Sequence, residues 1–130
     1  IYLSIMLHLT IAQTNTIYVT LTEKQSLGNP NYLFRFKNRT THEEVRFVRL
    51  YATDLSAFKE RYNQFSISVN TYFFQKDLGE WEYFIYEQIS TTNTDPALAY
   101  SLLETGIMVL DEVTSPTFTE YQSNNIFIVR

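Results

Sequence analysis

Acidic side chains spaced two residues apart are the first candidates for catalysis in this sequence. Glu80 and Glu82 flank a tryptophan, and Glu43 and Glu44 form a second acidic pair. On a strand, residues i and i+2 share a face and lie about 7 Å apart, a carboxylate separation that glycosidases use. Nothing in the surrounding sequence marks an apolar pocket that would raise the pKa of one carboxyl group. These acids are therefore expected to be solvent-facing side chains of an outer strand.

Nucleophilic and metal chemistry lack the residues that they require. The absence of cysteine excludes thiolate nucleophiles, thiolate zinc sites and disulfides together. The two histidines, His8 and His42, fall in a predicted strand and a predicted turn, and no Gly-x-Ser-x-Gly, P-loop or Gly-x-Gly-x-x-Gly motif occurs. The possible calcium ligands are ordinary turn formers without the spacing of a calcium loop: Asn93, Asp95, Asp111 and Glu112. We therefore expect no enzymatic activity, no catalytic residue, no metal and no cofactor.

Aromatic side chains are more promising as binding residues. The chain has ten Tyr and ten Phe, and Tyr72, Phe73 and Phe74 are consecutive. If these three lie on a strand, at least one of them faces outward. Exposed aromatic rings stack on sugars, but they are also enriched at protein interfaces, which we favour in a small domain with so many of them. The further candidates for sugar stacking are Tyr2, Tyr100 and Tyr121.

A second candidate interface is basic. Four cationic residues lie on adjacent predicted strands: Arg35, Lys37, Arg46 and Arg49. The chain as a whole is acidic, with 10 basic and 14 acidic residues and a net charge of −4, which argues against nucleic-acid binding. A modest basic patch on such a protein is expected to meet an acidic protein surface. A solvated sheet face is the simpler alternative.

Short strands separated by turns must position these residues. Apolar and polar residues alternate with period two, which predicts strands at residues 7–11, 16–22, 32–37, 45–50, 65–69, 81–86, 97–103 with 107–110, and 126–129. Gly106 is expected to interrupt the seventh strand, and residues 54–63 have the spacing of a short helical turn. After Phe47 the alternation slips because Val48 and Leu50 are also apolar, which predicts a bulge or a two-sided central strand.

The length of 130 residues suits one domain, residues 1–130. About seven to eight strands without a long helix predict an all-β fold, an antiparallel two-sheet β-sandwich with Greek-key connections. A jelly roll or an open barrel is the alternative. The apolar residues 1–12 are too short to span a membrane and lack a basic region, so they predict a first strand or docking segment. A retained secretion segment is the alternative there.

One heptapeptide carries a resemblance at the level of the fold. Asp77-Leu78-Gly79-Glu80-Trp81-Glu82-Tyr83 resembles the Asp-x-Gly-x-Tyr-x-Cys corner that opens the sixth strand of immunoglobulin-like sandwiches. Trp81 takes the position of the corner tyrosine, and Tyr83 takes that of the cysteine. An indole N–H can donate the return hydrogen bond to the backbone but cannot accept one. The resemblance implies an immunoglobulin-like sandwich and leaves the corner bond open.

Six stretches carry a wider resemblance: residues 18–24 (YVTLTEK), 29–36 (NPNYLFRF), 61–65 (RYNQF), 79–88 (GEWEYFIYEQ), 103–106 (LETG) and 121–125 (YQSNN). Together they resemble small virion proteins of tailed bacteriophages, especially of crAss-like phages that infect Bacteroidetes. The resemblance implies a non-enzymatic, immunoglobulin-like domain that decorates the phage head, with no active-site residues to transfer.

The resemblance therefore implies an auxiliary capsid (decoration) protein, located in the virion and assembled in the bacterial host cytoplasm. Its expected partners are the major capsid protein, other virion proteins and neighbouring copies of itself, with no nucleic acid and no membrane. The alternatives are a tail, baseplate or head-fibre component, or a carbohydrate-binding module for host attachment. The expected interface residues are Tyr72, Phe73, Phe74, Arg35, Lys37, Arg46 and Arg49.

Overall fold

The computed structural model describes residues 6–112, and within that range the fold is all-β. The strands are β1 (Met6–Thr10), β2 (Thr14–Val19), β3 (Asn31–Asn38), β4 (Glu44–Arg49), β5 (Asn63–Ser68), β6 (Gly79–Gln88) and β7 (Ser101–Asp111). A five-residue helix, α1 (Val69–Phe73), follows β5 directly, and short 3₁₀ turns span Thr22–Lys24, Tyr51–Thr53 and Pro96–Leu98. The predicted strand at residues 126–129 lies outside the described residues.

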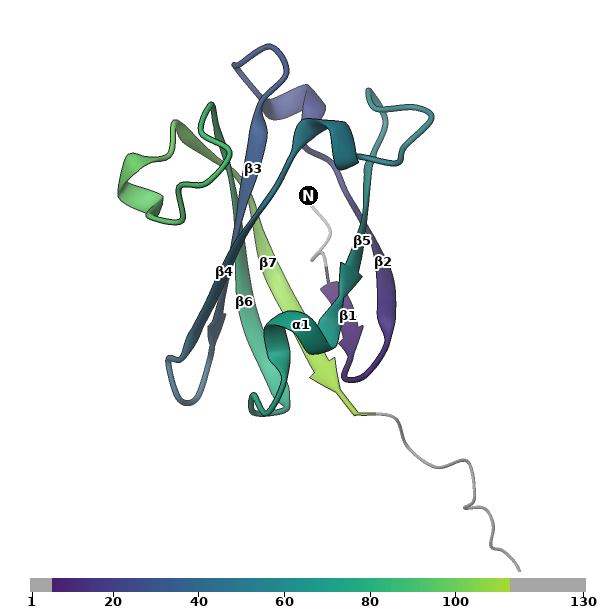
Figure 1. The fold of residues 1–130 in the computed structure, drawn as a ribbon, viewed down its shortest axis with the longest axis vertical. Coiled ribbons are helices and arrows are strands. Elements are labelled where there is room, and N and C mark those ends of the chain that lie inside the picture. The colour runs from purple at the N-terminus through teal and green to yellow at the C-terminus, as the bar shows by residue number, and fades with distance from the viewer. Residues whose placement is uncertain (1–5, 113–130) are drawn as a thin grey trace, which may run out of the picture.

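The strands form a curled five-stranded sheet of order β1-β7-β6-β3-β4 and a two-stranded sheet of order β2-β5 (Figure 1). All pairs are antiparallel except β1 and β7, which run parallel with Met6 opposite Ile107 and Thr10 opposite Asp111. The prediction of purely antiparallel pairing is therefore wrong for this pair. Parallel neighbours need a long connection, and here the connection is the whole of the chain between the first and last described strands.

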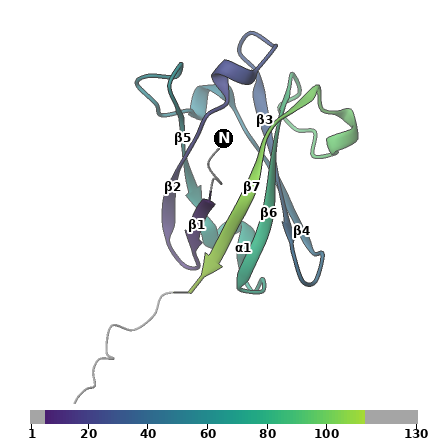
Figure 2. The ribbon, with the colours of Figure 1, turned by 180° about the vertical axis from the view of Figure 1, so that it is seen from behind.

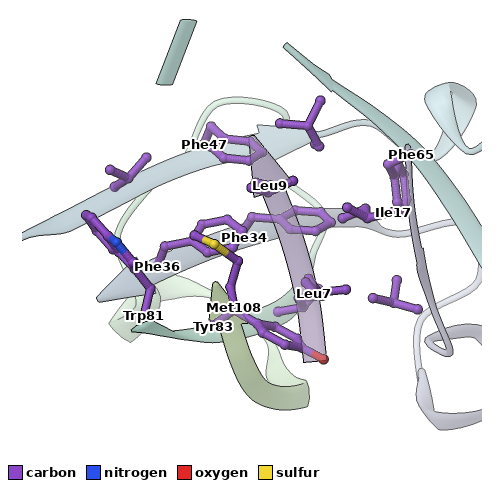
Figure 3. Close-up of a cluster of buried hydrophobic side chains, with 14 of the residues drawn as sticks. Leu7, Leu9, Ile17, Phe34, Phe36, Phe47, Phe65, Trp81, Tyr83 and Met108 are labelled. Atoms are coloured by element: carbon purple, nitrogen blue, oxygen red, sulfur yellow. The ribbon is translucent and has the colours of Figure 1, made fainter. Parts of the chain in front are cut away.

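A layer of buried side chains joins the two sheets. Phe34 on β3 stacks on Phe47 of β4 at 5.5 Å and meets Phe65 of β5 edge-on at 5.5 Å. Leu9 of β1 and Ile17 of β2 belong to the same cluster (Figure 3). Alternation places these residues on the inner faces of their strands, as the sequence predicted for residues 32–37 and 81–86. Each buried aromatic or aliphatic side chain contributes about 1.5–3 kcal/mol relative to exposure.

The corner at the start of β6 makes the return hydrogen bond that the sequence left open. Trp81 is fully buried, and its Nε1–H donates to the carbonyl oxygen of Asp77 at 3.0 Å. Its ring also packs edge-on against Phe73 at 5.4 Å. Gly79 has φ +116°, in a region that disfavours residues with a Cβ. The indole therefore stabilises the tight path of residues 77–81.

Two predictions about strand interiors are wrong. β4 is an edge strand with regular register against β3, so it is neither bulged nor central. The register shift in this sheet falls instead between Ile85 and Tyr86, opposite β7. Gly106 does not interrupt β7, because it pairs with Tyr83 inside a continuous strand.

The connection from β4 to β5 begins with the 3₁₀ turn Tyr51–Thr53 and is otherwise mostly irregular. The predicted helical turn is present as a single hydrogen-bonded turn, in which the Tyr62 N–H donates to Phe58 O at 3.1 Å, and it does not continue into a helix. Asp54 is buried, and its carboxylate accepts hydrogen bonds from the backbone N–H of Ser56 and of Gln64 and from the Asn63 amide. These bonds favour an irregular path because a side-chain acceptor replaces the backbone acceptors of a helix.

Candidate interaction surface

The side of the five-stranded sheet that points away from β2 and β5 presents a mixed polar and aromatic surface. Alternation along β3, β4 and β6 turns one residue outward for each core residue. We call this surface the outer face and define it by Arg35, Lys37, Glu44, Arg46, Phe84 and Tyr86, none of which is buried. Three of the predicted interface residues, Arg35, Lys37 and Arg46, therefore share one face.

The charges of the outer face are organised around Glu44. Arg35 donates from Nε and Nη2 to the two Glu44 oxygens at 3.1 and 2.9 Å, and Arg46 Nε donates to Oε1 at 2.8 Å. The hydrogen bond from Arg35 lowers the pKa of Glu44 to about 2, and the same pairing raises the pKa of Arg35. The Arg35 guanidinium also lies 4.7 Å from the centre of the Phe84 ring. Hydrogen bonds thus fix the side chains of this cluster, and Glu44 neutralises part of the positive charge of the two arginines. Such a cluster is better suited to contact with a protein surface than with a polyanion.

The loop between β6 and β7, residues 89–100, lies against the upper part of the outer face (Figures 1 and 2). Gln88 and Asn93 anchor it reciprocally, with two amide hydrogen bonds of 2.9 Å. The backbone N–H of Tyr100 donates to Glu87 O at 2.8 Å, and Arg46 Nη1 donates to Thr94 O at 3.4 Å. The hydrogen bonds therefore hold this loop in a defined conformation.

Four large apolar side chains on this loop and at the start of β7 face solvent. We call them the loop patch: Ile89 (79% exposed), Leu98 (73%), Tyr100 (62%) and Leu102 (48%). Singly exposed apolar residues are ordinary, but these four lie within fourteen residues of one another on an anchored loop and the strand that follows it, so they are the candidate interaction residues of this region. Of these four residues, only Tyr100 is a candidate predicted from the sequence, for sugar stacking. The available signal was the placement of Ile89 and Leu98 at the two ends of a polar run; Leu98 was assigned to the predicted strand 97–103, but it lies in the 3₁₀ turn Pro96–Leu98, and β7 begins at Ser101.

The predicted aromatic run is divided among three environments. Tyr72 and Phe73 lie on α1 and not on a strand, so the strand argument does not apply to them. Phe73 is fully buried, edge-on to Phe36 at 5.3 Å, and its prediction as an interface residue is wrong. Tyr72 stacks on Phe47 at 4.0 Å, whereas Phe74 is 60% exposed. Tyr2 and Tyr121 lie outside the described residues.

Arg49 does not belong to the outer face. Its Nη2 donates to the carbonyl oxygen of Ser66 on β5 at 3.2 Å, and its Nη1 donates to the Tyr72 hydroxyl at 3.3 Å. Its guanidinium also lies 5.5 Å from the centre of the Tyr72 ring. Arg49 therefore links the edge of β4 to the edge of β5, and the four predicted basic residues do not form one patch.

The acidic pairs of the sequence analysis lie at the surface in ion pairs. Glu80 pairs with Arg39 at 3.1 Å, and Glu43 pairs with Lys76 at 2.8 Å. Glu82 is partly exposed on the outward side of β6. No pair of these carboxylates is brought together with an apolar pocket in the described part of the chain.

Two buried carboxylates were not considered as acids in the sequence analysis, although their alternation with Ile85 and Met108 predicts inward positions. Glu87 accepts hydrogen bonds from the backbone N–H of Ser26 and Leu27 and from the Ser101 hydroxyl. The Glu104 carboxylate accepts hydrogen bonds from a side chain of β6 and from groups of the connection between β2 and β3. Both oxygens of each carboxylate accept hydrogen bonds from groups of the same chain, so both carboxylates stabilise connections between strands.

Over residues 6–112, no group of three or more His, Asp or Glu side chains is arranged to hold a metal ion. The helices described there are too short or too polar to cross a membrane. Comparisons with protein-family models, with curated proteins and with solved structures found no match to this chain. The functional argument therefore depends on the surface itself.

Proposed function

We propose that this chain is a structural protein of a bacteriophage virion, an auxiliary capsid protein that binds the major capsid shell and reinforces the head. The observation that carries the proposal is the loop patch: four exposed apolar side chains on a loop that hydrogen bonds hold in place. Such a surface binds without a large ordering cost, because its backbone is already fixed. The family resemblance supplies the class of partner.

We also infer an immunoglobulin-like β-sandwich. The strand order of the larger sheet supports this, because β7, β6, β3 and β4 follow the order G, F, C and C′ of variable-type domains. β2 and β5 then take the places of strands B and E. The hydrogen bond from Trp81 to Asp77 is a second support, since it replaces the corner bond of these domains.

Reinforcement of the shell follows from burial repeated over many copies. A stable interface buries about 800 Å² on each partner, and apolar area contributes about 25 cal/mol per Å². The loop patch supplies apolar contact, and the neighbouring Arg35–Glu44–Arg46 cluster supplies charge complementarity that orients the domain. Each added copy hides more shell surface and opposes the outward pressure of the genome.

The same surface is also compatible with the alternative location in the virion, in which the protein is a tail, baseplate or head-fibre component. Sugar binding has less support, because one of its expected stacking residues, Tyr72, already stacks on Phe47. Phe74 and Tyr100 remain the exposed candidates for that activity among the predicted aromatic residues in the described part of the chain.

A binding assay with heads assembled without this chain tests the proposal. The purified protein is expected to co-sediment with these heads and to raise their resistance to heating and low salt. The double variant Leu98→Ser/Tyr100→Ser should bind at least ~10-fold more weakly, since anchors of this kind dominate interface energies. The matched control is Leu55→Ser/Phe58→Ser, two residues of similar type and exposure on another connection. Equal effects of the two double variants, or no binding by the unmodified protein, would contradict the proposal.

A further inference from the structure

A cleft with a volume of about 520 Å³ lies at the end of the five-stranded sheet where β6 begins. Its lining residues come from the turn after β3, within residues 38–41, and from the corner at residues 77–80. The backbone N–H of Arg39 donates to Glu80 O at 3.1 Å and joins these two segments. The loop patch lies at the opposite end of β6, so the cleft is a separate surface (Figures 1 and 2).

Asn38, which lines this cleft, has an amide nitrogen without a partner. The residue is only 2% exposed. Its Oδ1 accepts hydrogen bonds from the backbone N–H groups of Thr40 and Thr41 at 2.8 and 2.9 Å, and only the oxygen of a carboxamide can accept both. Nδ2 therefore lies on the other side of the carboxamide, and it takes part in none of the hydrogen bonds formed within residues 6–112. A buried donor without a partner is unfavourable, so it indicates a ligand that accepts from it.

The other groups of the cleft complement this donor. The Asp77 side chain is exposed and takes part in no ion pair or hydrogen bond found in the described part of the chain. The carbonyl oxygen of the same residue accepts from Trp81 Nε1–H at 3.0 Å, which fixes the backbone there. Thr40 contributes a hydroxyl that can donate and accept, and Leu78, 46% exposed, contributes an apolar surface. The cleft thus offers a donor, an acceptor and an apolar contact.

These groups fit a neutral ligand that carries hydroxyl groups. An anion is disfavoured because Asp77 and Glu80 are carboxylates, and the neighbouring cations, Arg39 and Lys76, already pair with glutamates at 3.1 and 2.8 Å. A metal ion is disfavoured because Asn38 presents N–H groups and not its oxygen. The volume lies within the range of small-molecule sites, about 300–1,000 Å³. Adjacent hydroxyls of a sugar can accept from an amide and donate to a carboxylate at the same time, which matches the cleft.

We propose that this cleft binds a neutral sugar, with Asn38 Nδ2 donating to one hydroxyl and the Asp77 carboxylate accepting from the next. The Asn38 side chain and the Asp77 backbone are fixed before the ligand binds, which lowers the ordering cost. The site does not use the aromatic stacking residues predicted from the sequence, and the proposal does not rest on the capsid role. A copy bound to the shell through the loop patch leaves the cleft free to bind a glycan.

Nuclear magnetic resonance titration of the isotope-labelled, full-length protein tests the proposal. The probes are the methyl glycosides of glucose, galactose, mannose and N-acetylglucosamine, with sodium sulfate and calcium chloride as the alternative ligands. At least one sugar is expected to give saturable shifts in residues 38–41 and 77–80, and the two salts none. Saturable shifts there with a salt but with no sugar, or no shift with any probe, overturn the proposal.

The variant Asn38→Asp separates binding from folding. Its carboxylate still accepts from the backbone N–H groups of Thr40 and Thr41, but a second oxygen replaces the Nδ2 donor, so sugar binding should weaken at least ~10-fold. The matched control is Asn70→Asp, which makes the same charge change at an exposed position on α1 and should leave the affinity unchanged. Equal affinities of the two variants overturn the proposal.

A second variant, Asp77→Ala, removes the acceptor and keeps the backbone carbonyl that Trp81 uses. It should also weaken sugar binding at least ~10-fold. The loop-patch variant Leu98→Ser/Tyr100→Ser should bind the sugar as the unmodified protein does, because these residues lie at the other end of β6. Full binding by Asp77→Ala together with lost binding in the loop-patch variant would place the sugar at Tyr100 and overturn the proposal.

Discussion

The Tyr83 hydroxyl donates a 2.6 Å hydrogen bond to Glu104 Oε2, joining β6 to β7 inside the body. Tyr83 is fully buried and Glu104 is 4% exposed. The other carboxylate oxygen accepts from the backbone N–H of Thr20 at 3.2 Å and from Lys24 Nζ at 3.3 Å. Burial, and then the hydrogen bond to Glu104, raise the pKa of Tyr83. This carboxylate thus connects three segments and depends on the tyrosine for one of its bonds.

Replacing Tyr83 with Phe is expected to lower the free energy of unfolding by about 1–3 kcal/mol, because a buried charged acceptor loses a donor. Urea denaturation measures the change. Tyr18→Phe is the matched control, since Tyr18 is 57% exposed, and it should change stability by less than about 0.5 kcal/mol. Equal costs for the two variants would show that Glu104 does not need the Tyr83 hydroxyl.

Substitutions at Gly79 and Gly28 provide a second matched comparison. An added Cβ meets nothing within 4 Å at either position, but Gly79 alone of the two has positive φ, at +116°. Gly79→Ala is therefore expected to cost about 1–3 kcal/mol through backbone strain. Gly28→Ala should be close to neutral, within about 0.5 kcal/mol. Thermal unfolding of both variants measures the difference, and a harmless Gly79→Ala would argue against the tight corner before Trp81.

The Glu44 cluster predicts a dependence of stability on pH. The pKa of Glu44 falls from 4.5 to about 2 on folding, so the folded state binds this proton more weakly than the unfolded state. The stabilisation is present above pH 4.5 and is lost as the pH falls toward 2. Allowing for solvent screening of a partly exposed group, it amounts to about 1 kcal/mol.

Urea denaturation of Glu44→Gln at several pH values tests that dependence. The variant should be less stable than the unmodified protein at pH 6, and the difference should disappear near pH 2. Glu60→Gln, at an exposed position outside the ion pairs found in residues 6–112, should show no such change. A constant difference across this range would mean that the carboxylate charge is not what Arg35 stabilises.

The strands were predictable from local pattern, and their partners were not. Phe34 and Trp81 lie inward because alternation on a half-buried strand is a local property. The parallel pairing of β1 with β7 joins Leu9 to Leu110, which are too far apart in sequence for any local pattern to relate. Phe73 was misplaced because a short apolar run after β5 fits a strand as well as the first turn of a helix.

The same distinction applies to the interaction surface. Arg35 and Arg46 were expected together, and the β3–β4 register places them directly opposite each other. Arg49 was grouped with them, although it is three residues from Arg46 and therefore points to the other side of the strand. The exposure of Ile89 and Leu98 depends on the path of a loop anchored by Gln88 and Asn93. That path is a tertiary property without a sequence period.

Imaging of the assembled phage particle, at a resolution that traces chains, tests the central claim most directly. The account predicts many copies of this domain bound to the shell, with the loop patch of residues Ile89, Leu98, Tyr100 and Leu102 in contact with the major capsid protein. Copies confined to the tail, or particles that contain none of this chain, would contradict it.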